Sequence, residues 1–161
     1  MNAVSAIATC SQLKIPIKSQ IKALSTFKGV SKRTDLVCEI NGVKVFDDFA
    51  HHPTAIEASI SSIKEKFAKK RLLTIFVPGS NSMILGAHNN KLMSSLKRSD
   101  KVIVLTKKRE IKNILRNNIK INVIESESQI RDYLVSRDIF DIILVLSNKN
   151  TENIIKHIKN G

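Results

Sequence analysis

Apolar residues recur at helical spacing in two short stretches at the start of the chain. Residues 2–13 and 18–27 both repeat them every three or four positions, and Pro16 separates the two stretches because proline cannot continue a helix. Gly29 marks the end of the second stretch. Two helices this short have little material for a core of their own, so we expect them to be the end of another domain.

Alternation of apolar and polar residues predicts a β-hairpin after these helices. The alternating runs cover residues 34–40 and 43–48. Asn41 and Gly42 join the runs, and both residue types tolerate the positive φ angles of a type I′ turn. Pro53, a few residues further on, suits the first turn of a helix.

From residue 53 on, helical periods alternate with nearly continuous apolar runs, which are typical of strands buried on both faces. The expected order is a helix at 53–69, a strand at 71–77, a helix at 89–97, a strand at 101–105, a helix at 109–116, a strand at 119–125, a helix at 127–136, a strand at 142–147 and a helix from residue 151. The sequence therefore predicts an α/β fold: a Rossmann-like, mainly parallel sheet with helices on both faces, preceded by the hairpin and the two short helices.

Composition restricts the setting and the partners. The formal net charge is +13, but the basic residues are spread along the chain and aromatic residues reach only 4%, so we expect no nucleic-acid partner. No apolar run approaches the roughly 20 residues of a membrane span, so we expect no membrane partner. Cys10 and Cys38 form no metal-ligand spacing. A cytoplasmic protein is the simplest interpretation.

Short polar side chains gather in the loops that follow the expected strands. Ligands of such sheets bind beyond the carboxyl ends of the strands. The polar residues in these loops are Asp48, His51, His52, Ser80, Asn81, Ser147 and Asn148. Their convergence predicts a ligand site at this edge of the sheet.

The segment VFDDFAHHPT at 45–54 leaves three interpretations open. In the first, its carboxylate and imidazole groups are metal ligands. No further Cys or His completes the usual set of four ligands, so we expect no metal site. In the second interpretation, Asp48 and His51 cap or brace the following helix. In the third, the segment is a ligand-facing loop. The pattern G-x-x-x-x-G-K-[ST] is absent, so the sequence contains no phosphate-binding loop of its own.

Five stretches in order resemble the C-terminal end of the bacterial Mur ligases, ATP-dependent enzymes that form amide bonds in peptidoglycan synthesis. The stretches are NAVSAIA at 2–8, FKGVSKRTDL at 27–36, VFDDFAHHPTAI at 45–56, VPGSNSM at 77–83 and LSN at 146–148. The stretch at 45–56 is most similar to one branch of the family, the enzymes that join the tripeptide L-Ala-γ-D-Glu-meso-diaminopimelate to UDP-N-acetylmuramate in peptidoglycan recycling. The resemblance implies that residues 1–31 are a remnant of the end of the central ATPase domain and that residues 32–161 form the C-terminal domain.

The resemblance also implies roles for particular residues. Arg33 would contact the nucleotide phosphates, Asp48 the ribose, and His51 would support the same contact. The residues that would face the incoming peptide are Ser80, Asn81, Ser147 and Asn148. ATP and Mg²⁺ would be bound mainly by a central domain that is missing here, so we expect no catalytic residue in this chain and a separate chain that carries the N-terminal and central domains.

Four positions depart from the family pattern. Gly79 stands where the family has arginine, a cation suited to a substrate carboxylate, and Lys149 and Asn150 replace glycines. Thr34 replaces an apolar residue. These departures keep two alternatives open: the C-terminal domain of a UDP-N-acetylmuramate–L-alanine ligase, and a non-catalytic remnant or interaction module.

Overall fold

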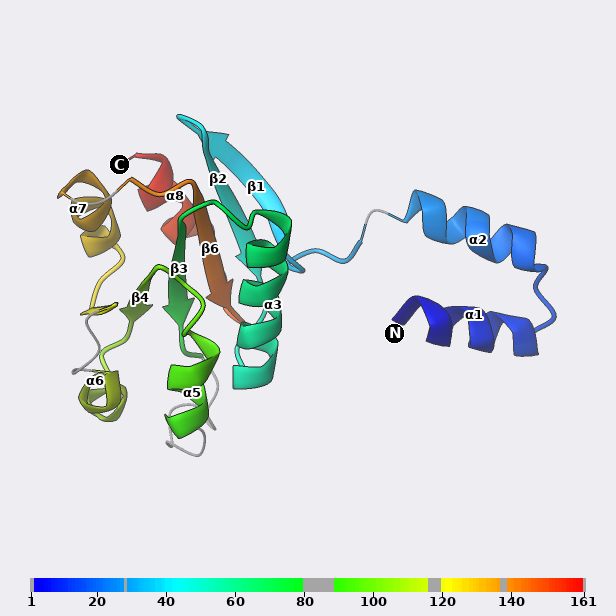
Figure 1. The fold of residues 1–161 in the computed structure, drawn as a ribbon, viewed down its shortest axis with the longest axis horizontal. Helices are drawn as coiled ribbons and strands as arrows, with labels where there is room; N and C mark the ends of the chain where they lie inside the picture. The colour runs from blue at the N-terminus through cyan, green and yellow to red at the C-terminus, as the bar shows by residue number, and fades with distance from the viewer. Residues whose placement is uncertain (1, 28, 80–88, 116–119, 137–138, 161) are drawn as a thin grey trace. The chain divides into compact units, whose positions relative to one another are not determined.

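The computed structural model describes residues 2–27, 29–79, 89–115, 120–136 and 139–160 (Figure 1). The chain divides into two compact units, Met1–Ser31 and Lys32–Gly161.

The first unit is a pair of helices, α1 (Asn2–Gln12) and α2 (Ile17–Thr26). Gln20 is its one buried polar side chain among the described residues, and its amide nitrogen donates to the Ile15 carbonyl oxygen at 2.7 Å. This bond closes the turn between the helices. The pair has no described core beyond the face where the two helices meet.

The second unit is a six-stranded sheet with helices on both faces. Its strands are β1 (Asp35–Ile40), β2 (Val43–Asp48), β3 (Leu72–Val77), β4 (Lys101–Leu105), β5 (Ile121–Ile124) and β6 (Ile142–Ser147). Its helices are α3 (Pro53–Lys66), α5 (Asn89–Ser95), α6 (Arg109–Leu115), α7 (Ser128–Ser136) and α8 (Glu152–Lys159). The strand order is β1-β2-β6-β3-β4-β5, in which β1 is antiparallel to β2 and the other neighbours are parallel. The predicted α/β fold is confirmed.

Local sequence accounts for the hairpin and for the start of α3. Asn41 and Gly42 have φ angles of 50° and 82°, as a type I′ turn between β1 and β2 requires. Pro53 occupies the first turn of α3, where its missing N–H has no helical partner to lose. The helix ends at Lys66, three residues before the predicted end, because Phe67 leaves the helical conformation and packs its ring 5.9 Å from that of Phe46.

The core lies in two layers because successive strand residues point to opposite faces of the sheet. On one face, Phe46 and Phe76 pack with apolar residues of α3, α5 and α6. On the other face, Val45 and Ile75 pack with residues of α7 and α8. Both layers are buried, which explains why β3, β4 and β6 read as nearly continuous apolar runs.

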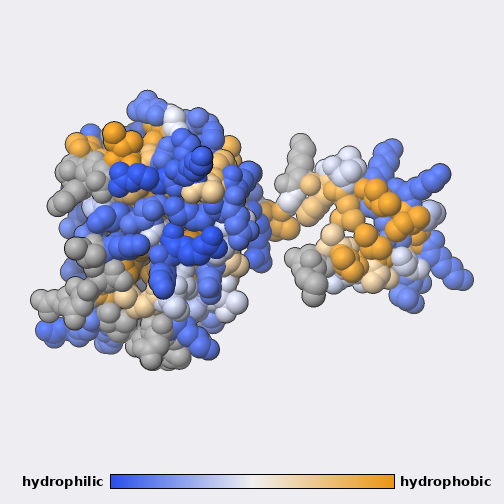
Figure 2. Space-filling view, viewed as in Figure 1, coloured by the Kyte–Doolittle hydropathy of each residue, from blue (hydrophilic) through white to orange (hydrophobic). Residues whose placement is uncertain are grey.

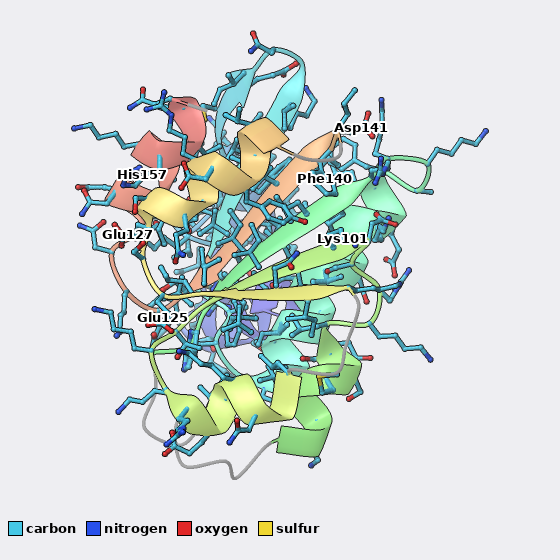
Figure 3. The ribbon with its side chains drawn as sticks, turned by 90° about the vertical axis from the view of Figure 1, so that its left-hand side faces the viewer. Lys101, Glu125, Glu127, Phe140, Asp141 and His157 are labelled. Atoms are coloured by element: carbon cyan, nitrogen blue, oxygen red, sulfur yellow. The ribbon has the colours of Figure 1, made fainter. Side chains whose placement is uncertain are left out.

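The parallel strands of the sheet all begin at one edge and end at the opposite edge. Figure 3 shows Lys101, Phe140 and Asp141 at the end where β4 and β6 begin, and Glu125 and Glu127 at the opposite end. Binding residues are expected at the second, carboxyl-terminal edge. None of the described helices combines the length and the apolar character needed to cross a membrane.

Candidate functional site

The carboxyl ends of β2, β6 and β3 lie next to one another. Asp48 is in register with Leu146, and Val77 is in register with Ser147. The structure therefore brings together three of the loops predicted to converge, those after Asp48, Val77 and Ser147. Ser80 and Asn81, also predicted here, lie outside the described residues.

The Asp48 carboxylate is buried, with 3% of the residue exposed. Its Oδ1 accepts a hydrogen bond from the Ala50 backbone N–H at 2.8 Å, and its Oδ2 accepts one from the Thr34 hydroxyl, also at 2.8 Å. Neither bond reaches the first turn of α3, whose N-cap residue, His52, makes no side-chain capping bond. Asp48 thus braces its own loop and the segment before β1, rather than the helix.

Asp47 points to the opposite face of the sheet from Asp48 because the two residues are adjacent in a strand. It is 5% exposed, and its Oδ2 accepts a 2.7 Å hydrogen bond from the Thr151 hydroxyl and lies 4.0 Å from Lys32 Nζ. Its Oδ1 is buried without a hydrogen-bond partner among the described residues. Burial raises the pKa of the Asp47 carboxyl above its ordinary value of 3.8, although Thr151 and Lys32 act in the opposite direction.

Lys32, the first residue of the second unit, is fixed on that unit through both backbone and side chain. Its N–H donates to Asp35 Oδ2 at 2.6 Å, and its carbonyl oxygen accepts from the Phe49 N–H at 2.8 Å. Its Nζ donates to the Lys149 carbonyl oxygen at 2.7 Å. Lys32 therefore joins the loop after β2 to the loop after β6. No sequence pattern indicated a role for Lys32, and Asp47 was considered only as one of the carboxylates weighed as metal ligands in segment 45–54. Strand alternation next to Asp48 was the one signal for its place on the opposite face.

Arg33 and His51 each carry a polar group that is accessible at this edge. The Arg33 side chain is exposed and has no hydrogen bond or ion pair to another described residue. His51 Nδ1 lies 3.0 Å from the Phe49 carbonyl oxygen, and its ring meets the Phe49 ring edge-on at 5.3 Å. A neutral His51 that donates through Nδ1 keeps Nε2 as an acceptor.

Ser147 and Asn148 differ in what they can offer a ligand. Ser147 is fully buried, and its Oγ accepts the Lys149 backbone N–H at 3.0 Å. Asn148 is half-buried and turns toward the loop after β3: its Oδ1 lies 2.0 Å from the position that a Cβ on Gly79 would take. Glycine is thus the one residue type that fits at position 79 beside this conformation of Asn148.

The described residues do not fit a Mg²⁺ site of their own. Within the described part of the chain, no three His, Cys, Asp or Glu side chains converge as metal ligands. Asp48 directs both oxygens to protein donors, and Asp47 faces the other side of the sheet. The exposed guanidinium of Arg33 instead suits this edge to an anionic ligand.

The fold is a Rossmann-like α/β domain, a class in which ligands bind beyond the carboxyl ends of the strands. Residues 32–149 match the family described as "Mur ligase, glutamate ligase domain". Because this match covers most of the chain, the chain belongs to the Mur ligase family, whose enzymes are ATP-dependent ligases.

Two relatives differ in the substrate that their names give. The chain is 36% identical over 105 residues to the UDP-N-acetylmuramate–L-alanyl-γ-D-glutamyl-meso-2,6-diaminoheptandioate ligase of Haemophilus influenzae, an alignment that covers 65% of this chain and 23% of that protein. It is 41% identical over 103 residues to the UDP-N-acetylmuramate–L-alanine ligase of Caldicellulosiruptor bescii, covering 64% of this chain and 22% of that protein. The aligned part thus spans less than a quarter of either relative.

Solved structures show the same fold. A murein peptide ligase from Psychrobacter arcticus superposes with a TM-score of 0.76 and 31% identity, over 99% of this chain and 36% of that one. A Mur ligase from Thermotoga maritima, solved in complex with ADP, superposes with a TM-score of 0.64 and 19% identity, over 87% of this chain and 33% of that one.

Proposed function

We propose that residues 32–161 act as the C-terminal domain of an ATP-dependent ligase that joins L-Ala-γ-D-Glu-meso-diaminopimelate to UDP-N-acetylmuramate in peptidoglycan recycling, in the cytoplasm. The observation that carries the proposal is the similarity to two ligases whose names give this kind of chemistry, from Haemophilus influenzae and Psychrobacter arcticus. The position of the DDFAHHP segment at the carboxyl edge of the sheet supports it, because this is where such folds bind ligands.

In this proposal, the nucleotide is contacted by Arg33, Asp48 and His51. Arg33 offers an exposed guanidinium, which can bind two phosphate oxygens at once, and His51 offers Nε2. Because Asp48 is buried and bonded to Thr34 and Ala50, a ribose hydroxyl reaches it only when this loop moves. We assign binding of the incoming peptide to four residues: Ser80, Asn81, Ser147 and Asn148.

Residues 1–31 are proposed to be the end of the central ATPase domain, and the rest of that domain would cover them. Figure 2 shows apolar residues on the surface of this unit. Among the exposed large apolar side chains are Leu13 at 71% and Phe27 at 63%. An apolar groove of about 500 Å³ is lined by Ala3, Ala6, Ile7, Cys10, Gln20, Ala23, Leu24, Phe27 and Val30. Exposed apolar side chains gathered around such a groove are typical of an interaction site. We propose that a separate chain with the N-terminal and central Mur ligase domains, which bind ATP and Mg²⁺, covers it.

The test is reconstitution of activity. The full chain would be mixed with a polypeptide that carries the N-terminal and central Mur ligase domains, with ATP, Mg²⁺, UDP-N-acetylmuramate and the tripeptide. We expect ADP release that depends on this chain and on the tripeptide. ADP release no higher than that of the partner polypeptide alone would contradict the proposal and favour a non-catalytic interaction module.

A second candidate is the C-terminal domain of a UDP-N-acetylmuramate–L-alanine ligase. It is favoured by the 41% identity to the Caldicellulosiruptor bescii enzyme of that name. Replacing the tripeptide with L-alanine in the same assay separates the two, because each ligase would release ADP only with its own amine substrate.

A further inference from the structure

Two residues that carry side chains adopt a left-handed backbone conformation on either side of Arg33. Lys32 has a φ angle of 57° and Thr34 has a φ angle of 54°. This conformation is unfavourable for any residue with a Cβ, and most of all for a β-branched residue such as threonine. Strained backbone of this kind persists only where surrounding contacts hold it, and it gathers at functional sites. The segment around Arg33 therefore depends on contacts that fix its backbone.

The two adjacent carboxylates at the end of β2 supply contacts to both neighbours of Arg33. Asp48 Oδ2 accepts a 2.8 Å hydrogen bond from the Thr34 hydroxyl. Asp47 Oδ2 lies 4.0 Å from Lys32 Nζ. Because adjacent residues of a strand point to opposite faces of the sheet, one carboxylate contacts the segment from each face.

Lys32 is anchored at three further atoms. Its N–H donates to Asp35 Oδ2 at 2.6 Å, and its carbonyl oxygen accepts from the Phe49 N–H at 2.8 Å. Its Nζ donates to the Lys149 carbonyl oxygen at 2.7 Å. Arg33, the next residue, is exposed and makes no hydrogen bond or ion pair with another described residue. The backbone beside Arg33 is thus fixed, while its side chain is left without a partner in the described part of the chain.

Asp47 is unfavourable for the stability of the fold. It is 5% exposed, its Oδ1 has no hydrogen-bond partner among the described residues, and burial raises the pKa of its carboxyl. A buried carboxylate with an unpaired oxygen makes the folded state less stable than a neutral side chain of the same shape would. The groups that favour its charged form are the Thr151 hydroxyl and the Lys32 ammonium group. Residues that cost stability beside a binding edge are typical of groups that position a functional side chain.

We propose that Lys32 and Asp47 are positioning residues, which fix the backbone that presents Arg33 to the nucleotide phosphates. The inference rests on the proposed function, because Arg33 contacts a nucleotide only in that proposal. Neither Lys32 nor Asp47 touches the nucleotide, and both act through Arg33. An arginine on a fixed backbone loses less conformational freedom when it binds two phosphate oxygens than an arginine on a loose segment. Removal of either positioning residue would therefore weaken nucleotide binding without removing a direct contact.

The test uses Lys32→Met and Asp47→Asn in the full chain, with Lys44→Met as the matched control. Lys32→Met keeps the apolar stem and removes the ammonium group, whereas Asp47→Asn keeps an acceptor for Thr151 and removes the charge. Lys44 is also ion-paired, with Glu39, but it lies at the other end of β2. Because Asp47→Asn relieves the burial of a charge, a loss of function in that variant would not come from unfolding.

The first readout is the kinetics of the reconstituted ligase. We expect Lys32→Met to raise the KM for ATP about fivefold with little change in kcat, and Asp47→Asn to raise it by a smaller factor. Lys44→Met should leave both constants unchanged. In an Arg33→Met background, Lys32→Met should change the KM for ATP by less than about twofold, because the residue through which it acts is gone. An unchanged KM in Lys32→Met or Asp47→Asn, or an equal effect of Lys32→Met with and without Arg33, would overturn the inference while the ligase function stands.

The second readout needs only the ¹⁵N-labelled full chain and separates failure of the inference from failure of the proposed function. NMR relaxation gives the order parameter of the Arg33 backbone N–H, which is about 0.85 for rigid backbone and below about 0.6 for flexible backbone. We expect it to fall in Lys32→Met and Asp47→Asn and to stay high in Lys44→Met. If it falls in this way but no amine substrate supports ADP release with the unsubstituted chain, the anchoring of the Arg33 backbone stands and the ligase function fails. An order parameter that stays high in both variants overturns the inference, whatever the ligase assay gives.

Discussion

The Thr34 hydroxyl donates a 2.8 Å hydrogen bond to Asp48 Oδ2. Thr34 lies just before β1 at a φ of 54°, a left-handed conformation that costs a β-branched residue about 1–2 kcal/mol. The bond links this strained residue to the end of β2 and offsets part of that cost. The orientation of the Asp48 carboxylate therefore depends in part on Thr34.

Substitution of Asp48 should separate its bracing role from a nucleotide role. Asp48→Ala leaves the Ala50 N–H and the Thr34 hydroxyl without their acceptor, so we expect a loss of about 1–3 kcal/mol in the free energy of unfolding, measured by urea titration. Asp48→Asn keeps an acceptor and removes the charge, so it should retain most of that stability. Full ligase activity of Asp48→Asn in the reconstituted enzyme would contradict a role for the charge in nucleotide binding.

The buried Asp47 should lower stability at neutral pH. Burial raises its pKa above 3.8, so between 3.8 and the raised pKa the folded protein binds more protons than the unfolded chain, and stability falls as the pH rises. Asp47→Asn keeps an acceptor for Thr151 without the charge. We expect it to be more stable than the unsubstituted chain at pH 7, with a difference that disappears below pH 3.8 in urea titrations at several pH values. A variant less stable at pH 7 would show that the Lys32 interaction outweighs the burial.

Asp100 should show the opposite pH dependence. Burial acts to raise its pKa, but the Leu72 N–H at 2.7 Å and Lys64 Nζ at 2.6 Å together lower it below 3.8. Its contribution to stability is present above pH 3.8 and is lost as the pH falls through the lowered pKa of the folded state.

We therefore expect Asp100→Asn to cost about 1 kcal/mol at pH 7, since the carboxylate is partly exposed. The difference from the unsubstituted chain should shrink in acid, as measured by urea titration. Asp132→Asn, at an exposed position on α7, is the matched control. Equal effects of the two substitutions would show that Asp100 makes no specific contribution.

Gly79→Ala should move Asn148 without unfolding the domain. The new Cβ would overlap Asn148 Oδ1, which is the end of a side chain that can rotate, so we expect a stability loss below about 1 kcal/mol and a clear change in the Asn148 side-chain amide NMR signals. Gly42→Ala is the contrasting control: its φ of 82° makes alanine strained, while a Cβ there meets nothing within 4 Å. Unchanged Asn148 signals in Gly79→Ala would contradict the packing of Asn148 against Gly79.

The elements were predictable because the forces that form them act between neighbours in the chain. Asn41 and Gly42 form the predicted turn, and Pro53 starts the predicted helix. Phe67 is an exception, because a contact with a residue distant in the sequence decides its conformation. The helical spacing of apolar residues predicts that α3 continues through Phe67. The helix instead ends at Lys66, and the Phe67 ring packs against that of Phe46.

The candidate site was predictable only as a region. Strand–helix alternation places Asp48, Ser147 and Asn148 at one edge of the sheet, and the structure has them there. The partners of these residues were not predictable. Asp48, at the end of β2, accepts a hydrogen bond from Thr34, just before β1. Asn148, after β6, lies against Gly79, after the neighbouring strand β3.

The sequence by itself determined the type and order of the elements, the turn at Asn41-Gly42, and the edge of the sheet where polar residues collect. Only the tertiary structure decided that Asp48 is buried against Thr34, that Asp47 faces the other side with Thr151, and that Asn148 lies against Gly79. The physical reason is distance along the chain. Propensity and alternation act over a few residues, whereas these contacts join segments whose separation in space is set by strand register and by packing of both faces of the sheet.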